Sequence, residues 1–477
     1  MIEEKQATAD EASVRVAAVP ARALGALVWI GPMLMLLGAA VGSGELLAEP
    51  AAGARHGGSL LWAIVLFILT KAFWNEVVGR VSIVTGQNFV EACCGAGPGL
   101  AWVPWAWYVV NVLKDFFLRG GIVAIAGLIC YDVFGPLPLP SSWSISGGDA
   151  ATGEQAVDSL QAVVWTFLNY GAIWLLLLLG GYTLAERINT ALCLLFTLSL
   201  TVCAFLVLPT AVGELGRGLL PTLPTDREGL LMLVSLSGIV MSGSTTVYYS
   251  AWAEERGMGL LGFVRRIGRR LTREQFEPQS REELRRMRLW LRINRINVTL
   301  TYCLGALVCL STFVLGVGVL RPAGVRLTGA ALAPELSLMM TEVIGPWAKG
   351  VFYVGGWAAV VSTAVGILDG GSRMYVQPLR HLAPELYAKV SFGTWQKLLM
   401  TLMVAGSWSV YVLYPDALTL VIWMGLIDAP LVGVLILAYA YLGRRYLPQA
   451  YRSGVLWTIA MCLTGLLYLG LSACCLF

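Results

Sequence analysis

The architecture follows from the stretch Gly31-Pro-Met-Leu-Met-Leu-Leu-Gly-Ala-Ala-Val-Gly-Ser-Gly-Glu-Leu-Leu-Ala-Glu-Pro50. It is apolar enough to enter a bilayer, but Gly42-Ser43-Gly44-Glu45 interrupts it halfway. Glycine weakens a helix, and the carbonyl groups that the interruption frees need other partners. Irregular backbone at membrane depth is tolerated only where protein buries it or it lines a wet cavity. A carboxylate there is costly, so Glu45 is a candidate functional residue; the alternative is a kinked span whose glycines allow close helix packing.

The composition is that of a polytopic membrane protein. Of 477 residues, 57% are hydrophobic and 13% are charged, and the mean hydropathy is +0.73; about a quarter of a soluble protein is charged. The net charge of +4 does not indicate a nucleic-acid partner, because the basic residues fall mostly on one side of the predicted membrane. The ten cysteines show no metal-ligand spacing and are interpreted as small hydrophobic residues. The two histidines fall in predicted loops, which argues against a His-ligated metal enzyme.

The hydropathy pattern predicts a chain that crosses the membrane many times. A span needs about 20 apolar residues, and by that rule we count about eleven spans. They lie near 24–50, 59–80, 101–130, 162–181, 187–209, 229–252, 296–319, 346–367, 394–414, 416–442 and 455–476. We therefore expect one transmembrane domain over 23–477.

The distribution of Lys and Arg predicts the orientation. The densest basic run, 257–295, joins spans six and seven, and the positive-inside rule places it in the cytoplasm. Residues 1–22 lack an apolar signal-peptide core and are expected to be a cytoplasmic N-terminal tail. The C-terminus then lies outside. The basic run is expected to contain a short charged helix on the membrane surface, with topology marking favoured over a regulatory or anionic-lipid role.

A second interruption occurs in the other half of the chain. Ser242-Gly-Ser-Thr-Thr246 breaks span six as Gly42–Glu45 breaks span one. Glycine-interrupted spans in matching positions of two halves indicate a transport site at the interface of two repeats. We assign the first repeat to about 24–209, the second to about 229–442, and an extra span to 455–476.

Several polar side chains accompany the two breaks. The hydroxyls of Ser242, Ser244, Thr245 and Thr246 are expected to face the Gly42–Glu45 break, where their oxygens and freed carbonyls would suit a hard cation such as Mg²⁺ or Mn²⁺. The alternative for each hydroxyl is a hydrogen bond to its own helix or to a neighbouring helix.

Other ionisable residues are candidates for the coupling pathway. Asp115 beside Lys114 is interpreted either as a proton relay or as a static pair that neutralises itself. Glu49, one turn beyond Glu45, is a weaker candidate that could instead cap a helix or pair near Arg55. Asp428 is also a weaker candidate. Two further pairs on span two, four residues apart, are expected to stabilise its inner end: Lys71 with Asn75, and Glu76 with Arg80.

At the two breaks the chain resembles the Nramp family of divalent-metal transporters. The resemblance is clearest over 31–62, in Gly31-Pro32, in Ala-Gly-Ala-Arg-His-Gly at 52–57 and in Ser59-Leu-Leu-Trp62. It implies an all-α polytopic membrane protein with a LeuT-type 5+5 inverted repeat, discontinuous helices one and six, and an eleventh span. It also implies an alternating-access carrier, with the metal bound between the broken helices and transport usually coupled to protons. A bacterial inner (plasma) membrane is the expected location.

The family's ligand residues do not carry over. Gly42-Ser43-Gly44-Glu45 stands where the family has Asp-Pro-Gly-Asn, so the metal-binding Asp is replaced by Gly42 and a carboxylate survives as Glu45. Ser242-Gly243-Ser244 stands where the family has Met-Pro-His, although a one-residue shift would recover Met241. Asp115 falls close to the acidic proton-pathway position of the family's third span. The pattern resembles the divergent Nramp-related branch, part of which is associated with Mg²⁺.

Three functional hypotheses follow. The first is a divalent-cation carrier, either proton-coupled or passive, with Mg²⁺ or Mn²⁺ as transported substrate rather than cofactor and the lipid bilayer as its environment. The second is a carrier of the same architecture for an amino acid or another small organic solute, with Gly42-Ser43-Gly44 cradling its carboxylate. The third is a membrane-embedded enzyme or sensor, for which no Ser/His/Asp, HExxH or paired-His arrangement is present.

Overall fold

The structure is a computed structural model, and it describes residues 15–19, 38, 44–139, 153–179, 182–325, 327, 331–382 and 384–475. Every regular element in these ranges is a helix. The longer helices are α4 (Ala48–His56), α5 (Leu61–Thr85), α8 (Val103–Phe134), α9 (Gly153–Leu178), α10 (Tyr182–Arg217), α11 (Arg227–Ile239), α12 (Tyr248–Arg256), α14 (Arg281–Leu315), α15 (Leu332–Ile344), α16 (Ala348–Leu382), α18 (Phe392–Leu413), α19 (Ala417–Tyr441) and α20 (Val455–Cys474).

Short helical elements connect them. They are η1 (Gly57–Leu60), α6 (Phe89–Gly95), α7 (Pro98–Ala101), η2 (Val240–Val247), α13 (Leu261–Ile267), η3 (Arg273–Phe276), η4 (Gly316–Leu320), α17 (Pro384–Lys389), η6 (Leu442–Tyr446) and η7 (Gln449–Tyr451). In the part of the chain that the structure describes, nine segments are long and apolar enough to cross a membrane.

Each predicted span from 59–80 onward except the sixth coincides with one of these helices, and the sixth, 229–252, covers α11, η2 and α12. Nine of them are the nine long apolar segments. The span at 394–414 forms α18, whose apolar character is weakened by Gln396 and Lys397 near its start. Of the first span, 24–50, the described part is Gly38 and 44–50. The helix α15 was not expected, because its 13 residues are too few to cross a bilayer.

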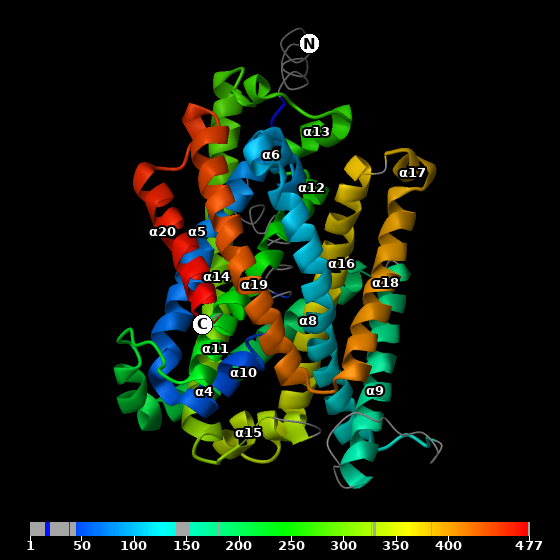
Figure 1. The fold of residues 1–477 in the computed structure, drawn as a ribbon, viewed down its shortest axis with the longest axis vertical. Helices are drawn as coiled ribbons and strands as arrows, with labels where there is room; N and C mark the ends of the chain where they lie inside the picture. The colour runs from blue at the N-terminus through cyan, green and yellow to red at the C-terminus, as the bar shows by residue number, and fades with distance from the viewer. Residues whose placement is uncertain are drawn as a thin grey trace, which may run out of the picture.

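The broken span six lies inside the bundle. The helix α19 packs against α8, α11 and α20, and α14 packs against α4, α5 and α10. Figure 1 shows α4 and α15 at one end of the molecule and α12 and α13 at the other, with α11 on the α4 side. The halves of span six therefore extend toward opposite ends, with η2 between them.

The basic run 257–295 is more helical than expected. It contains the short helix α13, but α14 already begins at Arg281, where the Ser280 side chain accepts a hydrogen bond from the Glu283 N–H. Much of the basic charge is therefore on the first turns of a helix that continues as span seven. Arg15 docks on this end, 2.8 Å from the Glu283 carboxylate.

Candidate functional site

Span six is broken by its backbone conformation. The helix α11 ends at Ile239, and Met241 and Gly243 then have φ of 54° and 51°. A positive φ is uncommon for a residue with a side chain, and such conformations gather at functional sites. At Gly243 a side chain is excluded, since a Cβ would lie 2.1 Å from Asp428 Oδ2 and 2.2 Å from the Gly238 carbonyl.

Span one has its interruption directly opposite. The carbonyl of Gly44 accepts hydrogen bonds from the N–H groups of Leu47, Ala48 and Glu49, a turn that leads into α4. A Cβ on Gly44 would lie 1.9 Å from the Ile239 side chain, so the absence of a side chain lets the two breaks meet. Gly42 and Ser43, both predicted site residues, lie outside the described residues.

Glu45 joins the two breaks. Its Oε1 accepts a hydrogen bond from the Met241 N–H at 3.1 Å and lies 3.7 Å from the Cys309 thiol of α14. Its Oε2 has no hydrogen-bond partner among the described residues, although the side chain is fully buried. A buried carboxylate oxygen without a partner is costly, which makes Glu45 a candidate site for a cation or a proton.

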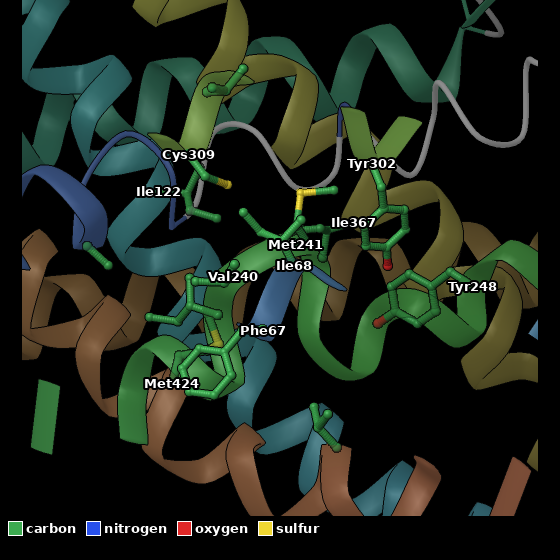
Figure 2. Close-up of a cluster of buried hydrophobic side chains, with 14 of the residues drawn as sticks. Phe67, Ile68, Ile122, Val240, Met241, Tyr248, Tyr302, Cys309, Ile367 and Met424 are labelled. Atoms are coloured by element: carbon green, nitrogen blue, oxygen red, sulfur yellow. The ribbon is translucent and has the colours of Figure 1, made fainter. Parts of the chain in front are cut away.

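Glu49 and Cys309 complete a cluster around Glu45. One ligand atom from each of these residues lies within 4.8 Å of the others, and all three are buried. Both carboxylate oxygens of Glu49 lack a hydrogen-bond partner in the described ranges. The suggested pairing of Glu49 near Arg55 does not occur, because Arg55 pairs with Glu228 at 3.0 Å. Figure 2 shows the Cys309 side chain near Met241 at the break.

Lys71 is the positive group of this region. It was expected to pair with Asn75 along α5, but it is fully buried and donates hydrogen bonds to the carbonyls of Gly238, at 3.2 Å, and Val240. The carboxylates of Asp428, Glu45 and Glu49 are near enough to attract its charge. The other pair expected on span two is present, with Arg80 2.6 Å from Glu76.

Ser244 makes its hydrogen bonds to α8 and α19, whereas its hydroxyl was expected to face the Gly42–Glu45 break. Its N–H donates to Asp428 Oδ2 at 2.8 Å, while its hydroxyl donates to Asn111 Oδ1 at 3.0 Å and accepts from Lys114 Nζ at 2.8 Å. These partners are on α8 and α19. Thr245 and Thr246 are buried within η2, and of Ser242 only the backbone is described.

Lys114 and Asp115 belong to a larger network and are not an isolated pair. Lys114 Nζ lies 3.3 Å from Asp428 Oδ1 and 3.6 Å from Asp115 Oδ1. Asp115 Oδ2 is 3.1 Å from the Arg119 guanidinium. The same oxygen accepts hydrogen bonds from two phenols, Tyr248 at 3.0 Å and Tyr375 at 2.5 Å. The network ties α8 to α12, α16, α19 and η2.

Two participants had only weak sequence signals. Asp428 was a minor candidate, although an acid inside the apolar helix α19 is itself unusual. Cys309 was interpreted as a small hydrophobic residue, because a lone cysteine in an apolar span has no pattern that marks it.

A broken span six that meets the turn before α4 at buried carboxylates, inside a helical membrane bundle, is an arrangement typical of secondary transporters with discontinuous helices, among them those with the LeuT-type fold. Residues 33–477 match the Nramp family, described as natural resistance-associated macrophage protein-like. The chain belongs to this family. That membership confirms the predicted family and identifies the chain as a transporter, not an enzyme.

Known proteins agree with this assignment. The divalent metal cation transporter MntH of Acidiphilium cryptum is 25% identical over 352 residues, which are 72% of this chain and 68% of that relative. The manganese transporter of Eremococcus coleocola superposes with a TM-score of 0.67 at 12% identity, over 97% of this chain and 89% of that one. MhsT in complex with L-phenylalanine superposes with a TM-score of 0.58 at 15% identity, over 97% of this chain and 100% of that one. These superpositions confirm the predicted all-α LeuT-type fold.

Proposed function

We propose that this chain carries a divalent metal cation across the membrane by alternating access, and that Mn²⁺ is preferred to Mg²⁺. Transport of a divalent metal cation is supported by the family, whose relatives include a divalent metal cation transporter and a manganese transporter. The observation that supports a site in this chain is the buried cluster of Glu45, Glu49 and Cys309, with its unpartnered carboxylate oxygens.

The donor atoms favour Mn²⁺ over Mg²⁺. Carboxylate oxygens suit both ions, but Mg²⁺ is hard, demands near-ideal octahedral oxygen coordination and dehydrates reluctantly. The Cys309 thiol supplies a softer atom beside Glu45 Oε1. The divalent charge would be met by the carboxylates of Glu45, in the turn before α4, and of Glu49, in the first turn of α4. Gly42, Ser43 and Ser242 remain predicted ligands through backbone or hydroxyl oxygens.

Ser244 and Thr245 take a different part in this proposal. Because Ser244 contacts Asn111, Lys114 and Asp428, we assign it to shaping the break, not to binding the metal. Thr245 follows it in η2. The network of Lys114, Asp115 and Asp428 is our proposed coupling path for protons, because it connects the break to α8, α12 and α16 through fully buried groups. Rocking of spans one and six against the surrounding helices would then break and remake these contacts.

The organic-solute alternative has less support. An amino-acid carboxylate cradled by Gly42-Ser43-Gly44 would lie next to Glu45 and Glu49, and both carboxylates would repel it. Superposition on MhsT shows a shared fold and no more.

Proteoliposome uptake tests the proposal. We expect wild-type protein to take up Mn²⁺ faster than Mg²⁺, and Glu45→Gln and Glu49→Gln each to abolish Mn²⁺ uptake, because each loses a charged ligand in a buried site. The exposed variant Glu228→Gln is the matched control and should behave as wild type. An inward proton gradient should speed uptake, and Asp115→Asn should remove that acceleration.

Either of two results would contradict metal transport through the Glu45 cluster. One is normal Mn²⁺ uptake by Glu45→Gln. The other is thermal stabilisation of the purified protein by amino acids and not by Mn²⁺, since a ligand that binds the native state raises its stability.

A further inference from the structure

Lys71 is a fully buried charge that the proposed function does not use. It projects from α5 toward the broken end of α11, where its ammonium group contacts the carbonyls of Gly238 and Val240. Figure 2 shows Ile68, less than one turn before Lys71, close to Met241 at the same break. Lys71 is not a member of the metal cluster, which consists of Glu45, Glu49 and Cys309.

The position that Lys71 fills has the features of a cation site. The last carbonyls of a helix lack intrahelical partners and carry the negative end of the helix dipole. In transporters with broken helices, unwound carbonyls and half-helix C-terminal ends coordinate monovalent cations. The carboxylates of Asp428 on α19, of Glu45 before α4 and of Glu49 on α4 attract the Lys71 ammonium group electrostatically. One ammonium group is thus in contact with two backbone carbonyls and in the electrostatic field of three carboxylates.

We propose that Lys71 is a tethered cation that occupies a monovalent-cation site at the broken end of α11. The ammonium group satisfies the Gly238 and Val240 carbonyls and fixes the chain just before Met241, whose N–H holds Glu45. Lys71 is therefore a positioning residue for the metal cluster. It also offsets one of the two carboxylate charges there, so that a divalent ion meets a smaller negative charge. A free Na⁺ or K⁺ is then unnecessary at this place.

Shortening the side chain should open the site to a free cation. In Lys71→Ala the carbonyls and carboxylates remain but the ammonium group is gone, which leaves room for methylammonium or Na⁺. In Lys71→Met an uncharged side chain of similar length fills the same space. The exposed Lys397→Ala is the control for loss of a lysine elsewhere.

The experiment is thermal unfolding of the purified proteins in detergent, with EDTA present and no divalent metal. Each is measured in choline chloride and then in methylammonium or sodium chloride at equal ionic strength. We expect Lys71→Ala to have a lowered Tm in choline and to recover, with saturation, in methylammonium or Na⁺. Wild type, Lys397→Ala and Lys71→Met should not respond to the change of cation.

A Lys71→Ala protein that responds no more than Lys71→Met would overturn the proposal. Failure to recover Lys71→Ala in any of these salts would also count against it, because a replaceable cation is its central claim. The assay contains no transported metal, so its outcome is independent of whether Mn²⁺ uptake is observed.

Discussion

At the scale of single residues, the Cys309 thiol is the group that separates the two favoured ions. Its sulfur lies 3.7 Å from Glu45 Oε1 in a fully buried setting. Replacing it by serine keeps a small polar group but exchanges soft sulfur for hard oxygen. We expect Cys309→Ser to bind Mn²⁺ about tenfold more weakly, a loss of about 1.4 kcal/mol, and to bind Mg²⁺ no more weakly than wild type.

Isothermal titration of both ions into wild type and Cys309→Ser measures this directly. The exposed Cys303→Ser serves as the matched control, because it lies outside the cluster. An unchanged ratio of Mn²⁺ to Mg²⁺ affinity in Cys309→Ser would remove the thiol from the ligand set.

Individual residues also mark how far the sequence could predict the site. Glu45 could be found because an acid beside two glycines in an apolar span is rare. Cys309 could not, because 264 residues separate it from Glu45 and only packing of α14 against α4 brings them together. The hydrogen-bond partners of Ser244 could not be predicted from the sequence either, because the irregular η2 backbone does not follow the α-helical periodicity that a sequence pattern assumes.

At the scale of elements, Gly243 determines how span six bends. Its φ of 51° and the close approach of Asp428 Oδ2 both exclude a side chain. We expect Gly243→Ala to destabilise the protein by about 1–3 kcal/mol from backbone strain alone, with more from the clash. The neighbouring hydrogen bond from the Ser244 N–H to Asp428 should be lost with it.

The matched control is Gly171→Ala in α9, where an added Cβ meets nothing within 4 Å of the described residues. That change should leave stability unchanged or raise it slightly, since alanine is the better helix former. Thermal unfolding in detergent compares the two variants. Equal melting temperatures for them would mean that η2 tolerates a different backbone and that Gly243 does not set the break.

The sequence predicted those helices that are long, uninterrupted apolar segments. It did not predict helical segments that are charged or short. Spans such as α19 and α20 follow from hydropathy alone. The start of α14 was missed because Arg281–Arg295 is too charged to resemble a span, although alternating Glu and Arg near its start form ion pairs such as Arg286 with Glu282 at 2.8 Å. Such pairs support an exposed helix that continues into the membrane.

At the scale of the whole molecule, orientation is the main property that the fold does not fix. The basic run 257–295 and the docked Arg15 lie at one end of the molecule, and α15 lies at the other (Figure 1). The positive-inside rule then predicts that α13 faces the cytoplasm and that α15 faces outward. Metal entering from outside would approach the Glu45 cluster from the α4 side.

Labelling of introduced cysteines in cells tests this orientation, with the background protein lacking the introduced cysteine as the control. In a background with the exposed Cys303 and Cys474 replaced by serine, Arg269→Cys next to α13 and Trp347→Cys between α15 and α16 provide one probe at each end. A membrane-impermeant maleimide added to intact cells should label Trp347→Cys and leave Arg269→Cys unmodified until the membrane is permeabilised. The opposite pattern would invert the assignment, and metal entering from outside would then have to reach Glu45 from the α12 end.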